Sequence, residues 1–240
     1  MADLRELFAA AGLPLAEDVL EKLEKYRALL LEWNGRMDLT SVSPEDMAAR
    51  HFLDSLLPLG QTGLIPEAGR LIDVGTGAGF PGLALAIARP GLQVTLLEAQ
   101  TKRCQFLAAV CEALALENVT LINDRAENLG RAAGHREEYD RAAARAVAPL
   151  PVLCEYLLPF VRVGGQALCW KGPAVSEEME DGRAAALALG GRVLPPVEMA
   201  APAWGGGHVL VPVQKIQKTI PQYPRKNGMP AKRPLKADKN

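Results

Sequence analysis

The hydrophobic positions of the first sixty residues repeat at helical spacing. They form two stripes with steps of three and four residues, and Gly12 suits the end of the first: Leu4, Leu7, Phe8 and Ala11, then Val19, Leu23, Tyr26, Leu30 and Trp33. Ser43 followed by Pro44 is typical of a helix start, so a third helix should carry RHFLDSLL and end at Pro58. The pattern predicts a helical subdomain over residues 1–62 that packs on the next domain.

From Arg70 onwards, short apolar runs alternate with helical stretches, which indicates βα units and a mainly parallel sheet. Seven strands are expected, over residues 70–75, 93–99, 119–124, 139–147, 165–172, 192–199 and 207–215. Helices are expected over residues 81–89, 102–116, 150–161 and 176–189. The segment APAWGG between the last two strands is too short for a helical crossover, so these strands should be antiparallel neighbours. We expect one α/β domain over residues 63–215, with helices on both faces of the sheet.

The composition is that of a globular protein: 240 residues, of which 49% are hydrophobic and 23% charged. The sequence contains no long uncharged apolar stretch, and its amphipathic N-terminus does not resemble a signal peptide, so we expect a cytoplasmic protein without membrane contact. The four cysteines form no CxxC pair and the three histidines are scattered, which argues against a metal site.

Charge is distributed unevenly along the chain. From Gln214 to Asn240 there are eight basic residues and one acid, whereas the chain as a whole carries a net charge of −1. A basic tail over residues 216–240 on an acidic body suggests a phosphate-rich partner, although a solvated terminus would have the same composition.

A glycine-rich turn, DVGTGAGFPG, follows the first expected strand. Glycines at the carboxyl end of a parallel strand let the backbone approach a nucleotide-like ligand. Gly77, Gly79 and Gly82 spell GxGxxG, and Glu98 occupies the place of a dinucleotide-binding acid, so an NAD-dependent oxidoreductase is one alternative. Asp73 before the turn, Pro81 within it and the antiparallel end of the sheet argue against a dinucleotide.

Together these features resemble the Rossmann-like class I methyltransferases that use S-adenosylmethionine. A closer resemblance is to the glucose-inhibited division protein B family, the guanine-N7 methyltransferases of small-subunit (16S) ribosomal RNA. It is carried by segments in matching order from about residue 26 to the tail: WN, DLTS, RHFLDS, DVGTGAGFPG, KR followed by FL, RAE, ARA, WKG and YPRKNGMPAKRPL. One departure is Asp38, where Asn is expected in the family's NLTS, so its role is open.

The resemblance implies a set of cofactor-binding residues: Gly75 and Phe80 at the methionyl and ribose side, Glu98, Ala99 and Gln100 at the ribose and adenine, Ala126 and Glu127 beside the adenine, and Arg145 where cofactor and RNA meet. On the residues alone, Phe80 also fits a core aromatic, and Glu127 a solvated acid at a helix start. The partner would be the ribosomal RNA or the 30S subunit, with Lys171, Arg225 and Lys226 as candidate RNA contacts and the protein acting as a monomer.

The absence of a catalytic base in the sequence agrees with this chemistry. Guanine N7 carries a free lone pair, so methyl transfer to it requires orientation and the exclusion of water but no removal of a proton. We interpret His51 and Asp54 as residues that hold the helical subdomain against the site, with a contact from Asp54 to the guanine edge as the alternative. A non-catalytic factor that binds ribosomal RNA is the remaining alternative.

Overall fold

A single sheet runs through the middle of the protein, whose computed structural model describes residues 2–199 and 208–237. Over these residues the sheet has eight strands in the order β3-β2-β1-β4-β5-β8-β6, and β7 also pairs with β8. The strands are β1 Gly69–Val74, β2 Leu92–Leu97, β3 Val119–Ile122, β4 Tyr139–Arg145, β5 Val161–Lys171, β6 Gly191–Val193, β7 Val197–Glu198 and β8 Val209–Lys215. Strands β1 to β5 pair in parallel, and β8 is antiparallel to its three neighbours. The expected α/β fold and its antiparallel end are confirmed.

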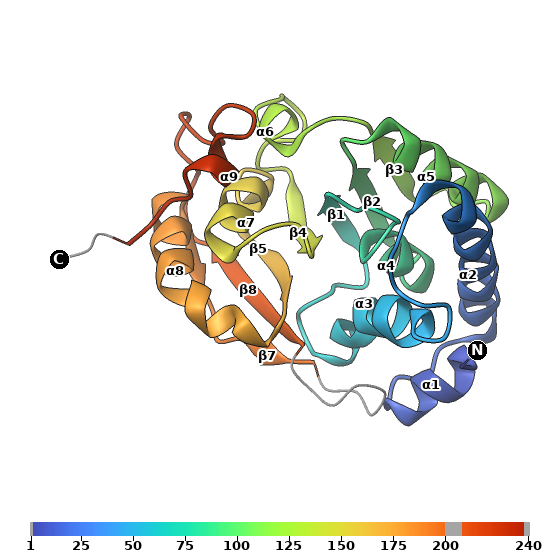
Figure 1. Ribbon diagram of the computed structural model, residues 1–240. Helices are drawn as coiled ribbons and strands as arrows, with labels where there is room; N and C mark the ends of the chain where they lie inside the picture. Colours follow the sequence, from blue (N-terminus) through green and yellow to red (C-terminus); the bar gives the residue numbers. More distant parts are fainter. Residues whose placement is uncertain (1, 200–207, 238–240) are drawn as a thin grey trace.

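Helices cover both faces of the sheet (Figure 1). Helices α2 (Glu17–Met37), α4 (Gly82–Ala88) and α5 (Thr101–Ala113) lie on one face, and α7 (Leu150–Leu157) and α8 (Met179–Ala188) on the other. Successive strand residues point to opposite faces, so that Leu71 belongs to the first core cluster and Ile72 to the second. The carboxyl ends of β1, β2 and β4 remain accessible between these layers.

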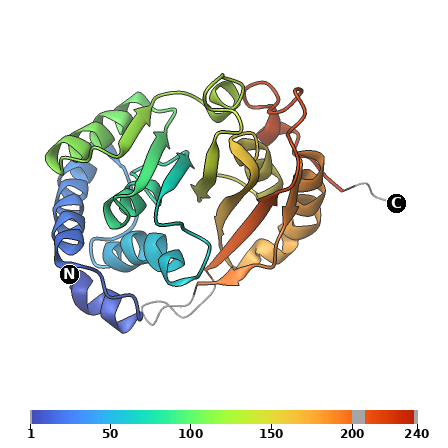
Figure 2. The same cartoon turned by 180° about the vertical axis from the view of Figure 1, so that it is seen from behind.

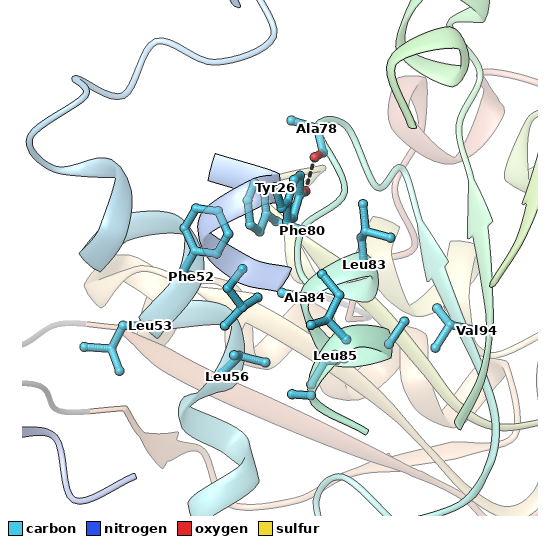
Figure 3. Close-up of a cluster of buried hydrophobic side chains, with 14 of the residues drawn as sticks. Tyr26, Phe52, Leu53, Leu56, Ala78, Phe80, Leu83, Ala84, Leu85 and Val94 are labelled. Atoms are coloured by element: carbon cyan, nitrogen blue, oxygen red, sulfur yellow. Dashed lines mark hydrogen bonds between the residues drawn. The ribbon is translucent and has the colours of Figure 1, made fainter. Parts of the chain in front are cut away.

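The N-terminal helices pack on the first face through aromatic side chains. Helices α1 (Leu4–Ala10) and α2 bury the two predicted stripes in the core cluster that also contains the sheet residues of this face. Figure 3 shows Tyr26 of α2 beside Phe80, whose ring it stacks on at 5.1 Å, and Phe52 meets both rings edge-on. Burial of these rings fixes α2 over the glycine turn.

The third helix differs from the prediction. It begins as expected, because the Ser43 hydroxyl accepts a hydrogen bond from the Asp46 N–H at 3.2 Å. It then continues as a π-helix over η1 (Ala48–Leu53), a short α3 (Asp54–Leu56) and a 3₁₀ turn η2 (Leu57–Gly60). Pro58 does not end it, because proline in the first turn of the 3₁₀ segment needs no N–H donor.

Other boundaries also move. The predicted strand over residues 192–199 divides into β6 and β7, since Pro195 and Pro196 between them have no N–H to donate. The helix predicted over 150–161 ends at Leu157, and that over 176–189 begins as a 3₁₀ turn, η3 (Pro173–Glu178), before α8. Helix α6 (Ala126–Leu129) begins at the helix start that Glu127 suggested, although Glu127 is buried and not solvated. The segment APAWGG and residues 238–240 of the tail lie outside the described residues.

After β8 the chain returns across the second face of the protein. We call residues 219–237 the C-terminal strap; it contains α9 (Met229–Lys232). Figures 1 and 2 show the strap against α6 and α7, at the opposite side of the molecule from α1. Over the described part of the chain, no helix is long and apolar enough to cross a membrane, and no group of side chains has the composition of a metal site.

Candidate cofactor and substrate site

Three adjoining cavities lie at the carboxyl ends of the parallel strands. The turn cavity, of about 380 Å³, shares Gly75, Glu98 and Val147 with a smaller acidic cavity of about 170 Å³. On its other side it shares His51 and Arg145 with the arginine cavity, of about 340 Å³. The residues that distinguish the cavities are Thr76, Gly77 and Phe80 for the turn cavity, Asp124, Ala126 and Glu127 for the acidic cavity, and Asp54, Trp170, Lys171 and His208 for the arginine cavity. The cavities therefore form a row with the glycine turn at its centre.

Asp73 holds the glycine turn from below. Its Oδ2 accepts hydrogen bonds from the Thr76 hydroxyl at 2.6 Å and from the Gly82 N–H at 2.7 Å, and the carboxylate is fully buried. Burial raises the pKa of Asp73 to about 6. Gly75 and Gly77 have φ values of +70° and +60°, which a residue with a Cβ adopts only with strain. The turn thus presents bare backbone to the cavity above it.

Glu98 links the turn to the second strand. It follows β2 directly, and its Oε2 accepts from the Gly77 N–H at 3.0 Å while its Oε1 accepts from the Gln100 N–H at 2.8 Å. Each carboxylate oxygen has a second lone pair, so Glu98 can also accept hydrogen bonds from hydroxyl groups of a ligand. Ala99 lines the acidic cavity, whereas Gln100 occupies the N-cap position of α5 without a side-chain cap and does not line any of the three cavities.

Arg145 forms the wall between the turn cavity and the arginine cavity. Its Nη1 donates to the Asp54 carboxylate and to the Arg50 carbonyl, at 2.8 and 2.9 Å, and its guanidinium lies 5.1 Å above the Phe80 ring. The next residue, Ala146, also borders both cavities and has a φ of +56°. Such strain at a non-glycine residue is typical of functional sites, where surrounding contacts enforce it.

The contacts of His51 fix its protonation state. Arg145 Nη2 can only donate, so His51 Nδ1, 3.0 Å away, must accept; the proton is on Nε2, which donates to the Thr40 hydroxyl at 2.7 Å. Burial, reinforced by the nearby Arg145 charge, lowers the pKa of His51 to about 3. His51 is neutral at physiological pH, and its lone pair is already occupied.

Asp54 accepts from two partners that are distant in the sequence. Besides Arg145 on its Oδ2, it accepts from His208 Nδ1 on its Oδ1 at 2.8 Å, and this hydrogen bond raises the pKa of His208. Trp170 Nε1 donates to the Asp54 carbonyl at 3.1 Å. The geometry agrees with the interpretation that His51 and Asp54 attach the N-terminal helices to the site.

The remaining candidates lie apart from one another. Lys171, in the arginine cavity, pairs with Glu178 at 2.7 Å and donates to the Ala148 carbonyl. Arg225 is on the strap and forms an ion pair with the buried Glu155, while its neighbour Lys226 is exposed. Glu127 accepts from the Gly228 N–H of the strap at 2.8 Å. The structure thus groups Gly75, Phe80, Glu98 and Arg145 around the turn cavity, places Ala126 and Glu127 next to it, and separates Arg225 and Lys226 from the arginine cavity.

Sequence reasoning missed three contributors. Tyr26 donates to the Ala78 carbonyl in the turn (Figure 3), Trp170 supports Asp54, and His208 completes the Asp54 contacts. Tyr26 was assigned only to a core stripe, and a polar atom on a buried aromatic is the one signal that it needed a partner. Nothing local in the sequence indicates that residues 154 positions apart, such as Asp54 and His208, will meet.

The lining suits a nucleoside that carries an amino-acid chain. The turn cavity offers bare backbone and the Phe80 edge, and the acidic cavity combines apolar walls with acceptors. Leu97, Ala99 and Ala126 form those walls, and Glu98 supplies acceptors for vicinal hydroxyls. This donor and acceptor set fits the adenosyl part of S-adenosylmethionine.

Comparison with known proteins decides the family. The family model for rRNA small subunit methyltransferase G matches residues 19–202, more than half of the chain. The chain belongs to this family. Ribosomal RNA small subunit methyltransferase G of Alkaliphilus metalliredigens is 45% identical over 94% of both chains, and that of Symbiobacterium thermophilum is 44% identical over 97% of this chain and 96% of its own.

The fold has similar solved structures outside the family. A mutant of MtNAS in complex with S-adenosylmethionine matches with a TM-score of 0.55 and 16% identity, covering 83% of this chain and 77% of its own. TYW2 of P. horikoshii in complex with MeSAdo matches with a TM-score of 0.54 and 16% identity, covering 74% and 65%. At this identity the likeness concerns the fold alone, which is that of class I methyltransferases.

Proposed function

We propose that the protein transfers a methyl group from S-adenosylmethionine to N7 of a guanine in small-subunit ribosomal RNA. The observation that carries this proposal is the row of three cavities centred on the glycine turn, in a chain that belongs to the rRNA small subunit methyltransferase G family. The protein would act as a cytoplasmic monomer on the ribosomal RNA or the 30S subunit.

Each part of the cofactor has a counterpart in the row. The acidic cavity would hold the adenine beside Ala126 and Glu127, and Glu98 would accept from the ribose hydroxyls. Gly75 and Phe80 would line the methionyl end, next to Arg145. When bound, S-adenosylmethionine supplies a methyl group on a positively charged sulfur.

Two groups at the far end that could remove a proton are already engaged by hydrogen-bond donors. The Nδ1 lone pair of His51 is occupied by Arg145, and both oxygens of Asp54 accept hydrogen bonds from charged or polar partners. Guanine N7 has no proton to lose, so this chain needs only to orient the base and to exclude water. The arrangement favours N7 as the nucleophile over an exocyclic amine, which must release a proton.

The arginine cavity is where we place the target guanine. Trp170, Val42 and Ala148 contribute apolar surface, and Lys171 supplies a donor suited to the guanine O6. Because the major groove of an RNA helix is deep and narrow, the base must come from a loop or be turned out of its stack. Arg50 is exposed at this cavity and can meet the phosphate that follows.

Calorimetric titration of the purified protein with S-adenosylmethionine, S-adenosylhomocysteine and NAD tests the cofactor. We expect saturable binding of the first two and none of NAD. Binding of NAD alone would replace the proposal with a dinucleotide enzyme. Incubation with 16S RNA and 30S subunits, followed by mass spectrometry of the nucleosides, tests the product; RNA binding without 7-methylguanosine would indicate a non-catalytic factor.

Glu98→Ala sharpens the assignment of the ribose site. The change removes the acceptors for the hydroxyls and the support of Gly77, so we expect the dissociation constant for S-adenosylmethionine to rise at least tenfold, about 1.4 kcal/mol. Glu112→Ala, on the exposed side of α5, is the matched control. Unchanged affinity in Glu98→Ala would remove this carboxylate from the cofactor site.

A further inference from the structure

Side chains of the main domain form hydrogen bonds with the backbone of the C-terminal strap. Arg136 donates to the carbonyls of Thr219 and Tyr223 at 2.7 and 2.9 Å, and Arg131 donates to those of Gln222 and Pro224. At its far end the Ala237 N–H donates to Asp181 on α8 at 2.9 Å. Contacts with main-chain atoms fix the path of a segment whatever its side chains, so the strap is an ordered part of the fold.

One ion pair anchors the middle of the strap. Glu155, on the otherwise apolar helix α7, is fully buried, and its carboxylate accepts from the Arg225 N–H and from the Arg225 guanidinium at 2.5 to 3.0 Å. The hydrogen bond to Glu155 raises the pKa of Arg225. A buried carboxylate requires such a partner, so release of Arg225 would leave a costly charge inside the protein. Arg225 is therefore committed to the fold.

The strap also reaches the acidic cavity. Three residues after Arg225, the Gly228 N–H donates to Glu127 Oε1 at 2.8 Å. Within the described part of the chain this is the one hydrogen bond made by the Glu127 carboxylate, whose side chain is only 4% exposed and lines the cavity. Gly228 has a φ of +76°, which aims its N–H at Glu127.

We infer that the C-terminal strap is a positioning element of the cofactor site: Arg225 on Glu155 locks the strap, and the locked Gly228 N–H orients Glu127 toward the adenine end. The inference rests on the proposed function. Arg225 and Gly228 are positioning residues, since they act on the ligand through Glu127 and do not line the cavity themselves.

Docking of the strap and binding of the cofactor should be coupled, because both involve the Glu127 carboxylate. With the strap locked, Glu127 Oε1 is engaged and the orientation of its second oxygen is set before a ligand arrives, so less ordering remains to be done on binding. With the strap released, the carboxylate loses its donor and its fixed orientation. Strap docking and cofactor binding should then strengthen each other by the same factor.

Arg225→Gln tests the lock. We expect the dissociation constant and KM for S-adenosylmethionine to rise about tenfold, while kcat at saturating cofactor stays within about twofold. Arg225→Lys should recover part of the affinity, because it keeps the charge but not the paired geometry. Lys232→Gln, an exposed residue of α9, is matched in charge and position, and we expect it to leave the dissociation constant unchanged.

Gly228→Pro tests the hydrogen bond without touching the ion pair, and so guards against a simple loss of folding in Arg225→Gln. Gly228→Pro removes the N–H and, because proline holds φ at about −65°, also shifts the backbone from its φ of +76°. Gly228→Ala keeps the N–H and adds only backbone strain, because a Cβ there meets nothing within 4 Å. Cofactor affinity should fall in the order wild type, Gly228→Ala, Gly228→Pro. Folded Arg225→Gln and Gly228→Pro variants with wild-type affinity would overturn this inference alone. A wild-type protein without affinity for S-adenosylmethionine would overturn it together with the proposed function.

Discussion

The two ends of the row of cavities are closed by different parts of the chain and by different forces. At the arginine cavity, the N-terminal helices contribute the His51 ring, which stacks on Phe80, and the contacts of Asp54, next to residues of the first core cluster. At the acidic cavity, the strap is held by guanidinium groups on carbonyl oxygens and by one buried ion pair. The N-terminal helices are packed into the core, whereas the strap lies on the surface of the core.

Because of this difference, substitutions at the two ends should affect stability and ligand affinity to different extents. A change at the arginine cavity disturbs packing that the whole first face of the sheet shares, so stability and activity should fall together. A change in the strap disturbs polar contacts at one flank, and its main effect should be on ligand binding. The following variants probe that difference.

Arg145→Gln should have the largest effect. It removes the partner of Asp54, which is 2% exposed, and the donor to His51, so we expect a loss of about 3–5 kcal/mol in the free energy of unfolding together with loss of methyl transfer. Urea denaturation and the RNA assay measure the two effects. Arg162→Gln breaks an exposed pair with Asp140 and should cost less than about 1 kcal/mol. A stable but inactive Arg145→Gln protein would contradict the expectation that Arg145 contributes to both stability and activity.

His51 gives the first closure a pH dependence. Its pKa is about 3 in the folded protein and 6.5 when unfolded, so between these values the unfolded chain binds the proton and stability falls as pH decreases. From pH 7 to pH 5, the stability measured in urea titrations should fall by about 2 kcal/mol more in the wild type than in a His51→Gln variant.

The contribution of Asp73 has the opposite sign, because its raised pKa of about 6 makes the folded state take up a proton first as pH decreases. The comparison is therefore made with His51→Gln, which lacks the His51 contribution and keeps that of Asp73. Parallel stability curves for the two proteins between pH 7 and 5 would rule out a buried neutral His51.

Tyr26→Phe should have an intermediate effect. It removes the hydroxyl from the Ala78 carbonyl but keeps the ring stack, so we expect a loss of about 1–2 kcal/mol in stability and weaker cofactor binding through the loosened turn. Tyr156→Phe is the control, since its hydroxyl makes no hydrogen bond among the described residues although the ring lines the acidic cavity. Equal melting temperatures for Tyr26→Phe and wild type would show that the hydrogen bond adds nothing.

Lys226→Gln should have the smallest effect. The side chain is exposed on the strap, so stability should change by less than about 0.5 kcal/mol. If the strap meets RNA phosphates, the slope of log affinity against log salt should decrease by about one for this variant. Lys25→Gln, exposed on α2, serves as the comparison. An identical salt slope for Lys226→Gln and wild type would exclude this contact.

The sequence predicted those parts of the structure that depend on local pattern. Strands β1 to β5 and the glycine turn follow from apolar runs and glycine spacing, and Glu98 was placed correctly at the end of β2. The π-helix at His51 was not predictable, because the capping signal at Ser43 indicates where the helix begins but not whether its next turns are α or π.

Long-range pairs define the rest of the site. Arg145 and Asp54 are 91 residues apart, and composition gives no information on such a meeting. The strap was interpreted as a basic tail whose Arg225 and Lys226 contact RNA, yet a signal for docking was present: Glu155 lies in the apolar helix segment LPVLCEYL and therefore needed a buried cation. The net charge of the tail describes its composition, whereas a buried carboxylate without a local partner, such as Glu155, indicates where the tail packs on the protein.

The position of β8 has a consequence for the order of assembly during synthesis. Strand β8 lies between β5 and β6 in the sheet, although β6 precedes it in the chain. Until residues 209–215 leave the ribosome, β5 has an unpaired edge and β6 has no partner, so the nascent chain exposes an aggregation-prone strand edge beside the arginine cavity. The sheet closes only when its last strand is inserted, and the strap follows immediately behind it.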